Sequence, residues 1–126
     1  MYGSAGYRYD GALNLKHTNS MAFFPIDLAI NLEPGYRKAI EVDGLQLLLL
    51  QPGDKPLLIK NQCPHMDVRL DNADIESDLL RCKAHGIEFS LSDGKAQGPL
   101  RDVLTCLKFF PISFDDRFIG VDTDDL

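Results

Sequence analysis

Residues 57–91 read LLIKNQCPHMDVRLDNADIESDLLRCKAHGIEFSL. Within this stretch, two short apolar runs, Leu57–Lys60 and Leu79–Arg81, are each followed by a cysteine and then by a histidine. Apolar runs of this length, bounded by turn-forming residues, indicate β-strands. The stretch therefore predicts two loops at strand ends, each presenting one sulfur and one imidazole nitrogen, on a sheet rigid enough to position them.

The rest of the chain has the same pattern of short runs and turns. Asp43-Gly44 separates a strand containing Tyr36, Ile40 and Val42 from the run Leu45–Leu50, and Asp-Gly between two such runs is a strong hairpin signal. Further strands are expected at Ile87–Leu91, Thr105–Phe109 and Arg117–Asp122, and a helical turn near Asp71–Asp78. We expect an all-β fold, an antiparallel sandwich or partly open barrel of short strands with a two-loop subdomain.

The 126 residues fit one domain. Residues 1–21 show no periodicity and are interpreted as an N-terminal extension or tag. The domain is expected over residues 22–122, followed by an acidic tail at residues 123–126.

Charge and composition narrow the function classes. Lys and Arg number 13 and Asp and Glu 19, so the formal net charge is −6 and no basic stripe suggests nucleic-acid binding. The longest apolar run, Leu47–Leu50, is far shorter than the about 18–20 residues of a membrane span, and no secretory signal is evident. Three cysteines do not suggest a disulfide scaffold. We therefore expect a cytoplasmic protein that binds neither nucleic acid nor membrane.

The two cysteine–histidine pairs form the candidate site. They are Cys63-Pro64-His65 and, after sixteen intervening residues, Cys82-Lys83-Ala84-His85. Thiolates suit the irons of an iron–sulfur cluster, and imidazole also binds iron well. In Rieske centres two histidines replace two cysteines on one of the two irons, so loops that each carry one ligand of each kind could hold such a cluster.

At this point the sequence resembles a Rieske-type [2Fe–2S] ferredoxin, a single-domain Rieske protein. The family pattern is C-x-H, a spacer, then C-x-x-H-G and an aromatic residue, which here is Phe89. The family's following turn and proline loop match Ser92-Asp93-Gly94 and Gly98-Pro99-Leu100, so the resemblance covers about Ala22–Asp122. It implies one [2Fe–2S] cluster per chain, with metal and cofactor ligands Cys63 and Cys82 on the inner iron and His65 and His85 on the outer iron. Pro99 would lie on a loop covering the cluster.

Departures from the family pattern predict a low reduction potential. High-potential Rieske proteins have an additional disulfide-bonded cysteine in each loop, where this chain has Val68 and Ala84, and a hydroxyl residue where it has Ile87. Hydrogen bonds to the cluster sulfurs stabilise the reduced state, so their loss should lower the potential. Lys83 and Asp67 replace a common proline and a common glycine, with opposite expected effects on the potential.

Zinc is the main chemical alternative, although structural zinc ligands are usually spaced by two or more residues, unlike Cys63 and His65. A nucleophilic Cys63–His65 pair lacks an evident orienting acid. Cys106 is interpreted as a core residue of the apolar strand Thr105–Phe109, and His17 as a solvated residue.

The resemblance implies an electron-transfer component rather than an enzyme. Such ferredoxins pass electrons from a flavoprotein reductase to a terminal oxygenase, as a component of a dioxygenase system. The chain is too short for the oxygenase itself, and it has no G-x-G-x-x-G dinucleotide motif. Two alternatives remain open: a small subunit or domain of a larger reductase such as nitrite reductase, and a redox-sensing module. A monomer is expected.

Overall fold

The computed structural model describes residues 22–64, 67–101 and 104–126. The expected extension at residues 1–21, which includes His17, and the proposed ligand His65 therefore lie outside the described residues. In the described part, regular structure consists of short β-strands and three single turns of 3₁₀ helix, which confirms the all-β expectation. No helix in this part is long and apolar enough to cross a membrane.

The described residues divide into two compact units, one of residues 22–32 and 110–126 and one within residues 33–109. The elements of the first unit are β1 (Phe23–Leu28), η2 (Ala29–Asn31), β9 (Ser113–Asp115), β10 (Phe118–Asp122) and η4 (Thr123–Asp125). The second unit contains β2 (Tyr36–Val42), β3 (Leu45–Gln51), β4 (Leu57–Lys60), β5 (Asp74–Glu76), β6 (Leu79–Arg81), β7 (Glu88–Ser90) and η3 (Gly98–Leu100). The chain passes from the second unit to the first within β8 (Phe109–Phe110).

The first unit is an antiparallel sheet with the order β1-β10-β9. Its register shifts between Pro25 and Asp27, a bulge that accommodates a proline, which cannot donate to the ladder. Gly120 lies opposite Pro25, and a Cβ atom there would collide with the Phe24 carbonyl oxygen. This close backbone approach requires glycine. The expected acidic tail forms a single 3₁₀ turn, in which the Asp122 side chain accepts a hydrogen bond from the Asp124 amide.

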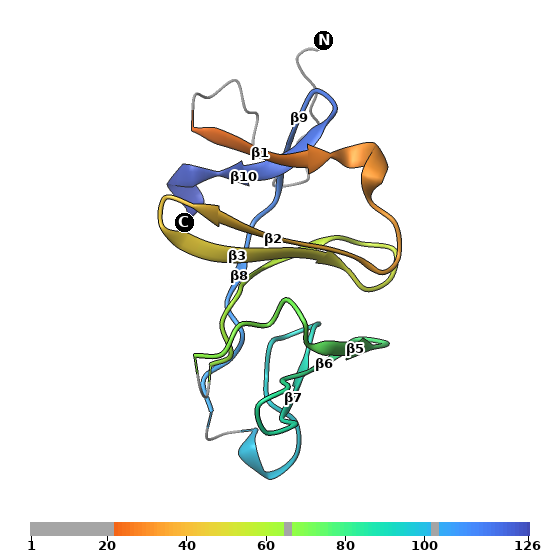
Figure 1. Cartoon of the computed structure of the whole chain (residues 1–126), viewed down its shortest axis with the longest axis vertical. Coiled ribbons are helices and arrows are strands. Elements are labelled where there is room, and N and C mark those ends of the chain that lie inside the picture. Colours follow the sequence, from red (N-terminus) through yellow and green to blue (C-terminus); the bar gives the residue numbers. More distant parts are fainter. Residues whose placement is uncertain (1–21, 65–66, 102–103) are drawn as a thin grey trace. The chain divides into compact units, whose positions relative to one another are not determined.

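The larger sheet of the second unit has the order β2-β3-β4-β8 (Figure 1). The β2–β3 hairpin turns at Asp43-Gly44 with φ angles of 53° and 81°. Positive φ at both turn residues is what a two-residue hairpin loop of this type requires, so the sequence expectation is confirmed. Strand β3 is an inner strand of this sheet, and its residues Leu47–Leu50 are all buried rather than alternating between buried and exposed.

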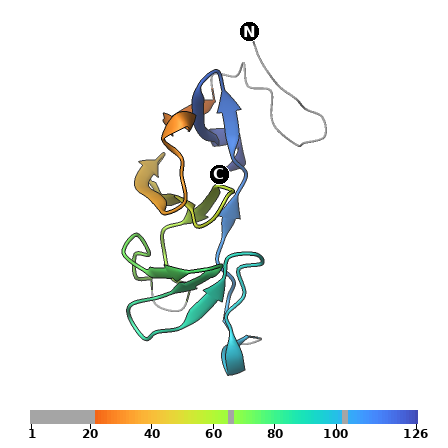
Figure 2. The ribbon, with the colours of Figure 1, turned by 90° about the vertical axis from the view of Figure 1, so that its right-hand side faces the viewer.

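The smaller sheet of the second unit has the order β5-β6-β7, and its strands run side by side, green to teal in Figures 1 and 2. A buried cluster joins the two sheets of this unit, with Leu48, Leu50 and Ile59 from the larger sheet and Leu80 and Phe89 from the smaller one. Leu80 and Phe89 are directly opposite each other across β6 and β7. Cys63 and Cys82, which begin the two candidate loops, belong to the same buried cluster.

Three sequence expectations are wrong. The segment near Asp71–Asp78 contains strand β5 rather than a helical turn, because Ile75 pairs with Leu80 and packs against the buried cluster. The strand expected at Thr105–Phe109 is only Phe109–Phe110. Cys106 is exposed, not a core residue, because it precedes Leu107, whose side chain takes the buried position.

Candidate metal centre

The first candidate loop follows β4 and begins at Cys63. The Cys63 amide donates a hydrogen bond to the Val68 carbonyl oxygen at 2.7 Å, and the Asp67 amide donates to the Cys63 carbonyl oxygen at 3.0 Å. Asp67 has a φ of 57°, in the left-handed region. These two bonds join Cys63 to Asp67 and Val68 at the other end of the loop.

The second candidate loop, at the tip of the β6–β7 hairpin, begins at Cys82. The Cys82 amide donates to the Ile87 carbonyl oxygen at 2.9 Å, and the Gly86 amide donates to the Cys82 carbonyl oxygen at 2.9 Å. Gly86 has a φ of 71°. In both loops the backbone of the cysteine is hydrogen-bonded to the residues four and five positions later. The residue four positions later has a positive φ, in the left-handed region.

This equivalence places the two sulfurs in corresponding positions. Cys63 and Cys82 are both fully buried, both belong to the same apolar cluster, and neither is in a disulfide. His85 is exposed. The site thus combines two buried thiols with an imidazole at the surface, while His65 lies outside the described residues.

Apolar side chains accompany the two cysteines. Val68 and Ala84, one in each loop, and Ile87, which ends the second loop, are partly buried against the same cluster. Pro99, expected on a covering loop, lies in η3 and is exposed. An apolar surrounding of this kind limits the access of water to the sulfurs, and so influences the reduction potential of a metal that they hold.

A polar network that the sequence reasoning missed supports the first loop. Asn61, which is 2% exposed, accepts a hydrogen bond from the Leu70 amide at 2.6 Å and donates to the Asp71 carboxylate at 3.3 Å. Arg37 reaches the same segment and donates to the Asp71 and Ala73 carbonyl oxygens at 3.0 and 2.7 Å. In the sequence, the only indication of this role of Asn61 is its position two residues before Cys63.

The pKa of the Asp71 carboxyl group is lowered from its ordinary value. A hydrogen bond from Arg69, with Nε 3.0 Å from Oδ1, lowers the pKa of this carboxyl group, and the Asn61 amide acts in the same direction. Asp71 is therefore ionised when it takes part in the network that follows the first loop.

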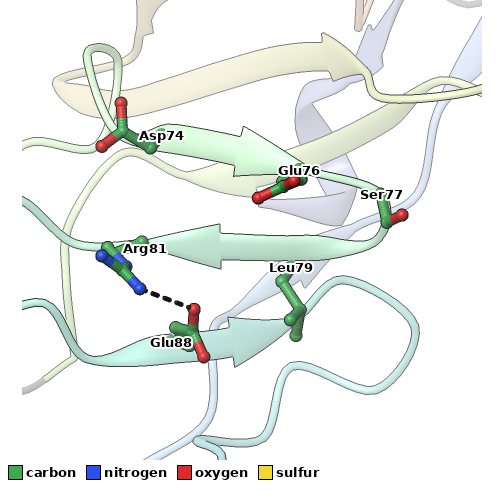
Figure 3. A pocket seen from close by; sticks show the side chains of 6 residues that line it. All are labelled: Asp74, Glu76, Ser77, Leu79, Arg81 and Glu88. Carbon is green, nitrogen blue, oxygen red and sulfur yellow. Dashed lines mark hydrogen bonds and ion pairs between the residues drawn. The ribbon is translucent and has the colours of Figure 1, made fainter.

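The sheet below the second loop carries charged side chains. Arg81 and Glu88 face each other across β6 and β7 and form an ion pair at 3.2 Å, drawn as a dashed line in Figure 3. Together with Asp74, Glu76, Ser77 and Leu79 they line a groove of about 430 Å³. Lys83, in the loop itself, pairs with Asp74 at 3.4 Å. These pairs are solvent-exposed, so each contributes about 1 kcal/mol at most.

The donor set fits an iron–sulfur cluster. Two buried thiols in equivalent loops are the ligands that such a cluster requires, and an exposed imidazole is a suitable ligand for a second iron near the surface. Among the described residues, no group of three or more His, Cys, Asp or Glu side chains could hold a single metal ion. A cluster with two protein ligands on each iron does not need such a group.

Solved structures share this fold. The chain matches the Sphingomonas yanoikuyae B1 ferredoxin with a TM-score of 0.67 and 17% identity, over 79% of this chain and 97% of that one. It matches the ferredoxin of carbazole 1,9a-dioxygenase from Nocardioides aromaticivorans IC177 with a TM-score of 0.66 and 22% identity, over 79% and 96%. It also matches a chain in a carbazole-bound complex of oxygenase and ferredoxin with a TM-score of 0.68 and 17% identity, over 80% of this chain but only 28% of that one.

No curated protein sequence matches the chain. A family model described as the Rieske [2Fe-2S] domain matches residues 22–108, which is more than half of the chain and includes both loops. The hydrogen-bonded loops, their buried thiols and this match lead to one conclusion: the chain belongs to the Rieske [2Fe-2S] domain family, and its cofactor is a [2Fe–2S] cluster.

Proposed function

We propose that this protein is a one-electron carrier whose [2Fe–2S] cluster is held by Cys63, His65, Cys82 and His85. The observation that carries the proposal is the pair of equivalent loops, each beginning with a buried cysteine outside any disulfide. When bound, the cluster takes up and releases one electron.

The proposed cysteine ligands lie in the interior, and the proposed ligand His85 lies at the surface. Cys63 and Cys82 are fully buried, so they would hold one iron inside the apolar cluster, away from water. His85 is exposed, so with His65 it would hold the other iron close to a docked partner. With neutral imidazoles, the charges of two ferric irons, two sulfides and two thiolates would sum to zero. One-electron reduction would leave a single negative charge on the site.

The ligand assignment is tested by single substitutions. Cys63→Ser and Cys82→Ser should each abolish the cluster's visible absorption and the EPR signal of the reduced protein, because serine is a poor substitute for a soft thiolate. Cys106→Ser is the matched control, since this cysteine is exposed and outside both loops. The assignment is wrong if Cys82→Ser retains iron and inorganic sulfide at the wild-type ratio.

The proposed partners are a flavoprotein reductase as electron donor and a terminal oxygenase as acceptor. Two of the matching structures are described as ferredoxins, and a third contains a ferredoxin in complex with an oxygenase, which supports the oxygenase as acceptor. We further propose that the protein works as a cytoplasmic monomer, where reducing conditions keep the cysteines available to iron. Stopped-flow mixing of the reduced protein with candidate oxygenases should show rapid oxidation by the correct one.

A module of a larger reductase is the second candidate. The match to only 28% of a longer chain shows that this fold also occurs as part of larger proteins. A redox-sensing role is the remaining alternative. A reduced protein that no oxygenase oxidises, but that binds tightly to a reductase subunit in a pull-down from the source cells, would favour the module over the carrier.

A further inference from the structure

The two loops have different residues at the position four residues after the cysteine. The left-handed residue is glycine in the second loop (Gly86) and aspartate in the first (Asp67). A left-handed backbone costs most residues about 1–2 kcal/mol, and aspartate tolerates it better than most without the freedom of glycine. A carboxylate therefore occupies a position at which the backbone favours glycine.

The Asp67 side chain has a defined partner. The Gln62 side-chain amide donates a hydrogen bond to Asp67 Oδ1 at 2.7 Å. Gln62 immediately precedes Cys63, so the bond connects the two ends of the segment that contains Cys63 and His65. The second loop cannot form this bridge, because Gly86 has no side chain.

The carboxylate also faces a pocket beside the first loop. The pocket has a volume of about 300 Å³ and is lined by Asp67, Gln62, Pro64, Lys60, Lys108, Thr105 and Cys106. The two lysines and water reduce the field of Asp67. They do not change the direction of its effect, because removing the negative charge of Asp67 makes the surroundings more positive whatever other charges remain.

We propose that the negative charge of the Asp67 carboxylate, in the first loop, lowers the reduction potential of the centre. One-electron reduction adds a negative charge to the cluster, and a nearby fixed negative charge opposes it. The inference rests on the proposed ligand set and adds a residue outside the ligand motif that acts on the centre through its charge.

The test is a redox titration of the cluster-loaded protein, followed by EPR and visible absorption. Asp67→Asn removes the charge and keeps a side chain that tolerates a left-handed backbone and can still accept from Gln62. We expect it to raise the midpoint potential, and Asp67→Gly to shift it in the same direction. Higher ionic strength should reduce the difference from wild type, since the carboxylate is exposed.

Two variants separate charge from loop position. Gln62→Ala removes the bridge but leaves the carboxylate, so its potential should stay close to wild type. Asp54→Asn removes an equal exposed charge in the turn between β3 and β4, at the opposite end of β4 from Cys63, and should have little effect. A Gln62→Ala shift as large as that of Asp67→Asn would overturn the proposal, because the bridge rather than the charge would then set the potential.

Failure of this inference is distinguishable from failure of the proposed function. If the wild-type protein binds no iron and sulfide, both are wrong. If it carries the cluster and Asp67→Asn has the wild-type midpoint potential, the electron-carrier proposal stands and the role of Asp67 does not.

Discussion

At the scale of single residues, the first loop depends on side chains that are not ligands. Asn61 is buried and satisfies the Leu70 amide, which has no strand partner of its own. A buried amide left without an acceptor costs about 1–3 kcal/mol. The loop that carries Cys63 is thus stabilised by a residue two positions before it.

We expect Asn61→Ala to destabilise the protein by about 1–3 kcal/mol, since it leaves the Leu70 amide without its acceptor. Urea unfolding followed by circular dichroism measures the change. Asn72→Ala is the control, because Asn72 is exposed, and a surface substitution of this kind should change stability by less than about 0.5 kcal/mol. Equal stabilities of the two variants would show that the Asn61 network does not hold the loop.

At the scale of elements, the turn after β7 is attached to the segment before β8 through a glycine. The Leu107 amide donates to the Gly94 carbonyl oxygen at 2.8 Å, and Gly94 has a φ of 79°. A Cβ atom at Gly94 would lie 2.9 Å from the Leu107 carbonyl oxygen, which is backbone and cannot rotate away. The sequence indicated a turn here, and the structure shows why its glycine is required.

Gly94→Ala should therefore destabilise the protein by more than Gly44→Ala. Both glycines have positive φ angles, but a Cβ atom at Gly44 would meet nothing within 4 Å, so Gly44→Ala measures the backbone cost alone. That cost is about 1 kcal/mol, and the contact with Leu107 adds to it. Thermal unfolding of the two variants tests the difference, and equal melting temperatures would contradict it.

At the scale of the whole molecule, the reduction potential is the property that determines which partners the protein can serve. The chain lacks the loop disulfide of high-potential Rieske proteins, since Val68 and Ala84 occupy the cysteine positions, and Ile87 replaces the hydroxyl residue. Ile87 is partly buried against the cluster of apolar residues. Its side chain cannot donate a hydrogen bond to a sulfur.

We expect a midpoint potential toward the bottom of the Rieske range of about −150 to +300 mV. Ile87→Ser should raise it, because a hydroxyl group can donate a hydrogen bond that stabilises the reduced cluster. Potentiometric titration of both proteins makes the measurement, with Ile87→Val as the control that shortens the side chain without adding a donor. A strongly positive wild-type midpoint would contradict the expectation.

The sequence by itself determined much of this protein. It determined strands β4 and β6 to the residue, the Asp43-Gly44 hairpin and the two loops that begin at Cys63 and Cys82, because these are local patterns of apolar runs and turn chemistry. The all-β class followed from the same local signals. The Rieske resemblance also came from ligand spacing, and the family match over residues 22–108 confirmed it.

Only the tertiary structure decided which segments pair with segments that are distant in the sequence. Strand β1 pairs with β10 from the other end of the chain, and β5 is a strand because β6 lies beside it, so neither is evident from its own residues. The burial of Leu107 left Cys106 exposed, and Asn61 and Gln62 acquired their roles from bonds to Leu70 and Asp67. Strand pairing, burial and side-chain bridges are interactions across the fold, and a local pattern does not contain them.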